Sequence, residues 1–380
     1  MCVSNSRASL LSRSAFLGAV SAAAVPLLAT SLPASAATPL VVPDGLSAPN
    51  ARAAHIAAGS PFVARRYAEI RALAASLGDA SLRENVVELL EHPEPRFMRR
   101  YPTEAARVEL RDALAREGFV AVDAPVAGIF PPVGAHGIAQ PFWSAPGSDT
   151  NGHHSYPGGL CAHELFNARM GEQFAQTYDR QYFDGRRDVD RDLAIAAALY
   201  HDIMKTVVFQ YRADGTFLDE LSIGATGGHH CLSGAEAIVR GHDARFVTVL
   251  LSAHAAPSLG DEAKVVTWCR AAAMIAGVDP VEFGLVRRTA DGFALAALAP
   301  IEAFVNHLSD HDYVLAIHAA HEVRPQLARV APRFGVNVGD AAALNWWRLR
   351  VCSEHSEIAL YGALTRGDDA FVAALTRTGA

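Results

Sequence analysis

The sequence predicts an all-α fold, and three observations support this prediction. Beyond residue 159, apolar residues recur at spacings of three and four, which is the period of a helix with one buried face. The alternating strand and helix patterns of a parallel α/β sheet do not occur along the chain. A composition of 51% hydrophobic and 19% charged residues is typical of a globular protein with a large core. We therefore expect a helical bundle with a small helical N-terminal section and a C-terminal helical extension.

The first 36 residues have the features of a signal peptide. They contain Arg7 and Arg13 but no acidic residue, then an apolar run from about Ala15 to Leu32, and then the small residues Ala34-Ser35-Ala36. An uncleaved membrane anchor is the weaker alternative, because the run is rich in alanine and only weakly apolar. The segment Ser12–Leu17 resembles a twin-arginine signal that lacks its second arginine. We expect an exported protein, periplasmic or secreted, with no stable membrane anchor.

Residues 37–150 are expected to form an N-terminal helical section followed by an irregular connector. Up to about Pro61 the chain is rich in Pro, Ala and Gly without periodicity, which indicates a loose segment. Prolines scattered over residues 119–158 exclude any long helix there. Between these two stretches the apolar spacing predicts helices over residues 62–77, 81–90 and 103–117.

Residues 151–285 are expected to form the central core, and residues 286–380 the C-terminal helices. A polar excursion from Tyr211 to Ile223, with Asp214-Gly215 at its centre, has the turn residues of a hairpin. Helices are predicted over residues 159–176, 190–209, 232–240, 243–255, 261–276, 299–308, 310–330, 341–365 and 368–376.

Charge and cysteine usage narrow the function classes. The formal net charge is −7 with no basic block, so we expect no nucleic acid polymer as a partner and instead a small-molecule substrate. Four cysteines follow the signal segment without CxxC spacing, which disfavours a zinc ribbon or a thioredoxin-type centre. Buried thiols are the expected state of the four, although export would permit disulfides among them: Cys161, Cys231, Cys269 and Cys352.

The segment that ends in His201-Asp202-Ile203-Met204-Lys205 carries the strongest chemical signal. An imidazole, a carboxylate and an ammonium follow a helix that is otherwise apolar enough to be buried. Burying these groups is costly unless they are paired or bound to a cation. A divalent metal would resolve this cost for His201 and Asp202, and Lys205 would hold a substrate anion or a neighbouring carboxylate.

Five further histidines strengthen the prediction of a metal site. His163 follows Gly158-Gly159 on the first turns of a predicted helix, His230 follows Gly227-Gly228, and His254 ends an apolar helix. The pair His153-His154 stands just upstream of His163. Two other His-Asp dipeptides, at residues 242–243 and 311–312, lie at helix junctions and are expected to be capping or surface residues.

Taken together, these residues resemble the HD-domain superfamily of metal-dependent phosphohydrolases. The resemblance rests on the pattern H-x-x-P-G-G-L-x-x-H that ends at His163, on H-D-I-x-K from His201 to Lys205, and on the spacing to His230 and His254. It covers roughly residues 150–285. It implies an HD-domain-like helical bundle in that region.

The resemblance also implies a set of ligands. His163, His201 and Asp202 would bind one divalent metal, closed by an aspartate from a later helix, and His230 and His254 would hold a second ion that Asp202 bridges to the first. Two positions depart from the family pattern: Ala255 stands where a second histidine is usual, and Ala273 stands where the closing aspartate is expected. Asp279 is the nearest substitute for that aspartate.

These implications lead to an expected function with two alternatives. We expect a metal-dependent phosphohydrolase acting on a small phosphate ester, such as a nucleotide, with Mn, Fe, Mg, Zn or Ni as the metal. Asp202 would be a ligand that orients the attacking water, while Lys205 and either His153 or His154 would bind the anionic group. The alternatives are a binding or regulatory module without turnover, which Ala255 and Ala273 favour, and an oxygenase with two irons.

Overall fold

The all-α prediction is confirmed by the structure. A computed structural model describes residues 39–134, 137–258 and 260–376, and in this part of the chain the regular elements are helices apart from two two-stranded antiparallel sheets. The described residues belong to a compact unit that spans Ala37–Ala380. The predicted signal peptide, residues 1–36, lies outside the described residues.

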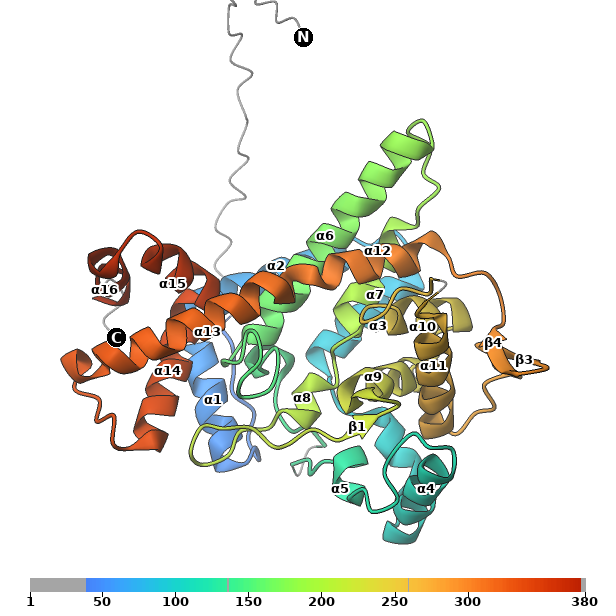
Figure 1. Cartoon of the computed structure of the whole chain (residues 1–380), viewed down its shortest axis with the longest axis horizontal. Helices are drawn as coiled ribbons and strands as arrows, with labels where there is room; N and C mark the ends of the chain where they lie inside the picture. The colour runs from blue at the N-terminus through green and yellow to red at the C-terminus, as the bar shows by residue number, and fades with distance from the viewer. Residues whose placement is uncertain (1–38, 135–136, 259, 377–380) are drawn as a thin grey trace, which may run out of the picture. The chain divides into compact units, whose positions relative to one another are not determined.

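The helices and strands follow one another in the order shown in Figure 1. The α-helices are α1 Ala48–Ala58, α2 Pro61–Ala75, α3 Ala80–Glu91, α4 Glu104–Arg116, α5 Val126–Ile129, α6 Gly159–Tyr182, α7 Arg191–Tyr200, α8 Lys205–Val208, α9 Gly228–Val239, α10 Ala244–Leu251, α11 Glu262–Ala276, α12 Ile301–Ser309, α13 Tyr313–Val330, α14 Ala341–His355, α15 Glu357–Leu364 and α16 Asp368–Thr376. The 3₁₀ helices are η1 Arg96–Arg100, η2 Phe142–Ser144, η3 Asp310–Asp312 and η4 Ala331–Phe334. The strands are β1 Ser222–Ile223, β2 Thr226–Gly227, β3 Val286–Thr289 and β4 Gly292–Leu295.

Three local differences separate this structure from the expected elements. The segment expected to be loose contains α1, whose first turn includes Pro49, a residue that suits the start of a helix. The helix expected over residues 190–209 is interrupted after α7 by a turn over residues 201–204. The helix expected over residues 341–365 breaks at Ser356, which adopts a φ of 62° and accepts a hydrogen bond from the backbone of Ala359 in the first turn of α15.

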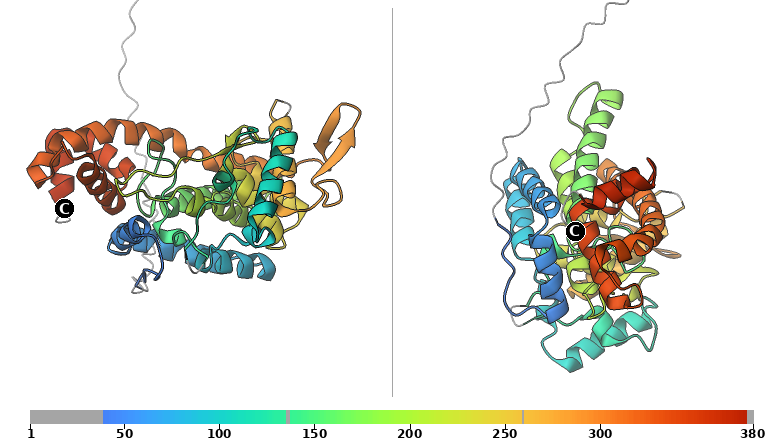
Figure 2. Two further views of the ribbon diagram at one scale, coloured as in Figure 1. Left: turned by 90° about the horizontal axis from the view of Figure 1, so that it is seen from below. Right: turned by 90° about the vertical axis from the view of Figure 1, so that its left-hand side faces the viewer.

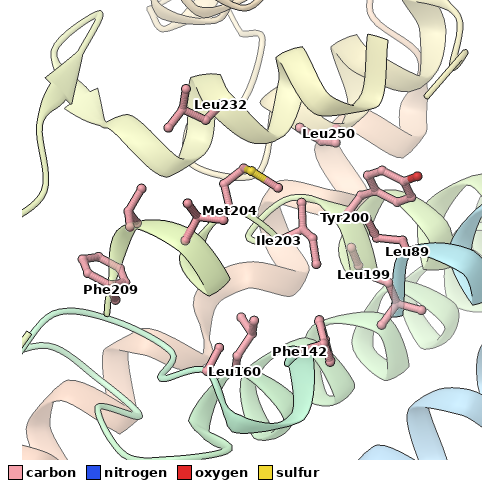
Figure 3. Packing of buried hydrophobic residues seen from close by; sticks show 14 of the residues in the cluster. Leu89, Phe142, Leu160, Leu199, Tyr200, Ile203, Met204, Phe209, Leu232 and Leu250 are labelled. Atoms are coloured by element: carbon pink, nitrogen blue, oxygen red, sulfur yellow. The ribbon is translucent and has the colours of Figure 1, made fainter. Parts of the chain in front are cut away.

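Helix α7 runs through the centre of the core. Every residue from Leu193 to Tyr200 is buried, so this helix has no face open to solvent. Figure 3 shows its last residues and the turn that follows, with Tyr200, Ile203 and Met204 packed against side chains from α3, α9 and α10. The packing holds residues 201–204 rigidly in the interior, and this turn carries the His201-Asp202 pair.

The other elements are arranged around this centre. Helices α13 to α16 gather at one end of the unit, and the β3–β4 hairpin projects at the opposite end (Figures 1 and 2). Trp346 in α14 is buried, stacks on Tyr211 and donates a hydrogen bond from its indole nitrogen to the carbonyl of Ala213, so it is a packing residue as the sequence suggested.

The four described cysteines, Cys161, Cys231, Cys269 and Cys352, are buried and unpaired, in line with the expected buried thiols. Among the described residues, no helix is long and apolar enough to cross a membrane.

Candidate metal centre

Six elements deliver side chains to one buried point of the fold. Helices α6 and α7 lie side by side there, and the ends of α9, α10 and α12 approach from the other directions (Figure 1). The side chains are His163 from α6, His201 and Asp202 from the turn after α7, Lys205 from α8, His229 from α9, His254 from the segment after α10, and Asp310 from η3.

Two glycines set the start of α6 and therefore the position of His163. Gly158 adopts a left-handed conformation with a φ of 85°, which side chains disfavour. A Cβ atom on Gly159 would lie 1.8 Å from the carbonyl oxygen of His154, so only glycine fits at this close approach. His163 then lies one turn into the helix and is buried.

The first group of ligand atoms consists of two imidazoles and two carboxylates. Nε2 of His163 lies 3.2 Å from Oδ2 of Asp202 and 3.2 Å from Oδ1 of Asp310. Nε2 of His201 lies 3.3 Å from the same two oxygens. These four side chains therefore direct two nitrogens and two oxygens at one point.

The second group uses the other oxygen of Asp202. Its Oδ1 lies 3.1 Å from Nε2 of His229 and 3.8 Å from Nε2 of His254, and the latter nitrogen is 3.5 Å from Oδ2 of Asp310. The opposite nitrogen of His229 makes a short contact with the carboxylate of Glu220, which fixes the ring. Asp202 therefore stands between the two groups and contributes one oxygen to each.

A layer of buried polar groups orients these side chains. Nδ1 of His201 donates to the carbonyl of Ala198 at 2.7 Å and lies 3.3 Å from the carboxylate of Glu164. Asn167 donates to Oδ1 of Asp310 at 3.0 Å. Lys205 pairs with Asp202 and donates to the carbonyl of Gly147 at 2.6 Å. Imidazoles and carboxylates held in this way from behind are typical of metal ligands.

The charges of the site shift the pKa values of its members in opposite directions. Burial opposes ionisation of both acids and bases here, but mutual attraction outweighs it. Burial lowers the pKa of His201, but the carboxylates of Asp202, Glu164 and Asp310 raise it. The net result is a pKa well above the ordinary value of histidine. Burial raises the pKa values of Asp202 and Asp310, but the imidazole of His201 lowers them. Both pKa values end well below the usual range of aspartate. A cation bound at this set would take the place of the protons.

The pKa values of His229 and His254 are shifted in opposite directions. Burial opposes protonation of His229, but Glu220 and Asp202 raise its pKa to about 9. Burial lowers the pKa of His254 to about 4, so this ring offers a neutral nitrogen.

Two observations indicate that the residues of this site are suited to bind a metal ion. Nε2 of His201, Nε2 of His229 and Oδ1 of Asp202 are sealed from solvent and lack a hydrogen-bond partner, and Oδ2 of Asp202 has only ion-pair contacts, with Lys205, His163 and His201. Such atoms are costly to bury unless they coordinate an ion. Two ligand atoms at about 2.1 Å from an ion and at right angles lie about 3.0 Å apart, close to the spacings in both groups.

One side of the centre opens into a pocket of about 250 Å³. Its lining residues are His153, His163, Ala253, His254, His307, Asp310, His311 and Tyr313. A pocket of this size admits a phosphoryl group and its nearest substituents.

The structure places four predicted site residues differently from the expectation. His230 is buried against His254 and Trp268, and it is His229 that reaches Asp202, because adjacent residues point about 100° apart on a helix. Asp279 does not join the cluster: its carboxylate is on the surface, where it accepts hydrogen bonds from the backbone of Val281 and Glu282.

The other two differences concern the anion-binding residues. His154 does not line the pocket, because its Nε2 donates to Asp312 at 2.8 Å, whereas His153 does line it. Lys205 is buried against Asp202 and so holds a carboxylate, the second of its two expected roles.

Sequence reasoning missed Asp310 and misjudged Asp312, whereas His311 is exposed as expected. Asp310 supplies the closing carboxylate, so Ala273 does not leave the first group short of a ligand. Asp312, which was expected to cap a helix or face solvent, is buried and pairs with His154. The available signal was an aspartate-rich stretch, Asp310-His311-Asp312, directly after an apolar helix. It lies outside residues 151–285, so the centre draws on the segment assigned to the C-terminal helices.

Comparison with known proteins gives one partial relationship. A stretch of 73 residues is 40% identical to the dihydroneopterin 2',3'-cyclic phosphate phosphodiesterase of Methanocaldococcus jannaschii. This stretch is 19% of the present chain and 28% of that protein, so the chain spans little more than a quarter of the relative's length. No family model and no solved structure matches the chain. The chain is thus similar in part to a phosphodiesterase, which is compatible with a phosphohydrolase of the HD type.

Proposed function

We propose that this chain is a metal-dependent phosphohydrolase of the HD type that acts on small phosphate esters. The observation that carries the proposal is the convergence of His163, His201, Asp202 and Asp310, from three separate parts of the chain, on one buried point. The partial similarity to a phosphodiesterase supports the same reaction class.

The two groups of ligands would bind their metal ions with different affinities. His163, His201, Asp202 and Asp310 offer one ion four protein ligands, which suits tight binding. Asp202, His229 and His254 offer a second ion three, and Ala255 adds none, so that ion would depend on water or substrate oxygen to complete its shell. We propose one tightly held metal per chain and a weaker, substrate-assisted second one.

When bound, the metal would polarise the phosphoryl group and lower the pKa of a water molecule. The chain's own residues would do the rest. Asp202, held by Lys205, contributes one oxygen to each group, and the pocket of about 250 Å³ gives a phosphoryl group access to them. His153 lines that pocket beside His163 and is placed to contact a phosphoryl oxygen.

The substrate class is a small phosphate ester, and cyclic phosphodiesters deserve the first assays because the similar protein is named for one. The purified chain would be incubated with 2',3'-cyclic and 3',5'-cyclic nucleotides, nucleotide monophosphates and sugar phosphates, each with Mn, Fe, Mg, Zn or Ni. Opening of cyclic diesters would be followed chromatographically and release of inorganic phosphate colorimetrically.

We expect metal-dependent hydrolysis of at least one substrate and its loss in Asp202→Ala. Full metal occupancy without hydrolysis would favour a binding or regulatory module. Two retained irons with oxygen-dependent product formation would favour an oxygenase. Either result would refute the proposed reaction.

A further inference from the structure

A second pocket, separate from the candidate metal centre, lies between α13, α14 and the loop that precedes α6, with Leu327, Ala328 and Leu344 as its apolar lining. Its volume is about 220 Å³. Arg324 from α13, Arg348 and Asn345 from α14, and Thr150 and Asn151 from the loop supply its polar lining. Figures 1 and 2 show α13 and α14 among the helices gathered at one end of the unit, away from the β3–β4 hairpin.

Arg348 is the unusual member of this pocket. It is only 8% exposed, yet among the described residues no protein atom accepts a hydrogen bond from its guanidinium and no carboxylate pairs with it. Burial, together with the positive charge of Arg324, lowers its pKa. Its guanidinium nitrogens are not among the polar atoms sealed from solvent, so they face the pocket, where an anion could pair with them.

Nearby charges do not neutralise this arginine. Glu357 is the carboxylate that raises the pKa of Arg348. It already accepts hydrogen bonds from Nε and Nη2 of Arg324 at 3.3 and 3.2 Å. Tyr211 and Cys352, the other titratable neighbours, are neutral because burial raises the pKa of each well above its ordinary value. Two guanidinium groups therefore share one carboxylate, which leaves one positive charge unmatched.

The remaining donors are arranged around the same space. Arg324 is fixed by donating from Nη2 to the carbonyl of Gly152 and the hydroxyl of Ser155, both at 2.6 Å, and its Nη1 donates to no described protein atom. The hydroxyl of Thr150 accepts from the backbone of Phe217 at 3.0 Å, so its proton is free to be donated. Guanidinium and hydroxyl donors that converge from three elements are typical of sites for phosphate.

We infer that this pocket binds a phosphate oxyanion between Arg348 and Arg324, either inorganic phosphate or the phosphate of a small monoester. This site is independent of the metal centre, because none of its lining residues is among the proposed metal ligands.

The test is titration calorimetry on the full chain after dialysis against a chelator, with inorganic phosphate and, separately, glycerol phosphate as the probes. Removing the metal suppresses binding at the metal centre, so the remaining heat reports the arginine pocket. We expect saturable binding of one equivalent, and the probe with the lower Kd identifies the source of the phosphate. A repeat with added metal should leave this binding event unchanged.

Variants of the pocket residues test whether the measured heat of phosphate binding comes from this pocket. Arg348→Gln should weaken binding about tenfold or more, because charge-assisted hydrogen bonds are lost. Asn345→Asp is the second variant: it loses the hydrogen bond of the Asn345 amide to the carbonyl of Asp214 at 3.1 Å, but it places a carboxylate one turn from Arg348 and should abolish binding, with thermal unfolding measured to show that the fold is kept. The control is Arg350→Gln, on the same helix, where Arg350 is exposed and pairs with Glu354 at 3.1 Å. It should leave Kd unchanged.

The inference is overturned if metal-free wild type shows no saturable phosphate binding, or if Asn345→Asp binds as wild type does. Equal weakening by Arg350→Gln and Arg348→Gln would also overturn it, since that result means nonspecific attraction. Failure of the proposed hydrolase would appear separately, as absent metal-dependent turnover with this binding intact.

Discussion

Replacing Asp310 with asparagine tests the assignment of the metal centre most directly. The amide has nearly the shape of the carboxylate and can still accept the hydrogen bond from Asn167 at Oδ1, so the fold should persist. What disappears is a negative charge that lies 3.2 Å from Nε2 of His163 and 3.3 Å from Nε2 of His201. The first metal would then lose one of its two carboxylate ligands.

The magnitude follows from the number of ligands that remain. Loss of a partner behind a ligand already weakens metal binding about 10–100-fold, so loss of an anionic ligand should cost at least about 100-fold, or roughly 2.8 kcal/mol. His163, His201 and Asp202 still provide three ligands, which is enough for a catalytic ion. We therefore expect weaker binding with turnover partly restored at high metal concentration.

The assay is elemental analysis after dialysis against a mild chelator, followed by turnover as a function of metal concentration. Asp279→Asn is the matched control, because Asp279 lies on the surface and contacts only nearby backbone. Asp310→Asn should lose its metal in dialysis while Asp279→Asn keeps it. The reasoning is refuted if Asp310→Asn retains a full equivalent, or if Asp279→Asn is the variant that loses it.

Four further predictions concern the site, the fold and the N-terminus. Asp202→Ala should lose both metal retention and turnover, because this carboxylate serves both groups, whereas His254→Ala should retain one tight ion; elemental analysis of the two variants decides. Saturating metal, at about 1,000 times its Kd, should stabilise the chain by roughly 4 kcal/mol, seen as a higher Tm than in chelator; an unchanged Tm would argue against a buried metal site. Gly159→Ala should lower the free energy of unfolding by about 3 kcal/mol or more, because its Cβ would collide with a carbonyl, while Gly362→Ala within α15 should be neutral or stabilising by up to about 1 kcal/mol; urea denaturation compares them. Exported protein should begin near Ala37, and an intact mass that includes residues 1–36 would contradict the signal-peptide prediction.

The sequence by itself determined the helical class and the part of the centre that local pattern encodes. Apolar spacing places most helices within a few residues of their observed bounds, because a buried face must recur with the helical period. The His201-Asp202 pair was recognisable because polar groups at the end of an apolar helix need a partner. The two glycines before α6 were recognisable because only glycine allows that turn and close approach.

Only the tertiary structure decided which of several equivalent side chains complete the centre. His229 and His230 are adjacent and equally plausible in sequence, and the rotation of α9 turns the first toward Asp202 and the second toward Trp268. Asp310 lies over a hundred residues from Asp202, and its place is set by how α12 packs against α6 and α7 rather than by any local pattern. Periodicity reports which face of a helix is buried, but the neighbour that this face meets depends on long-range packing of the whole chain.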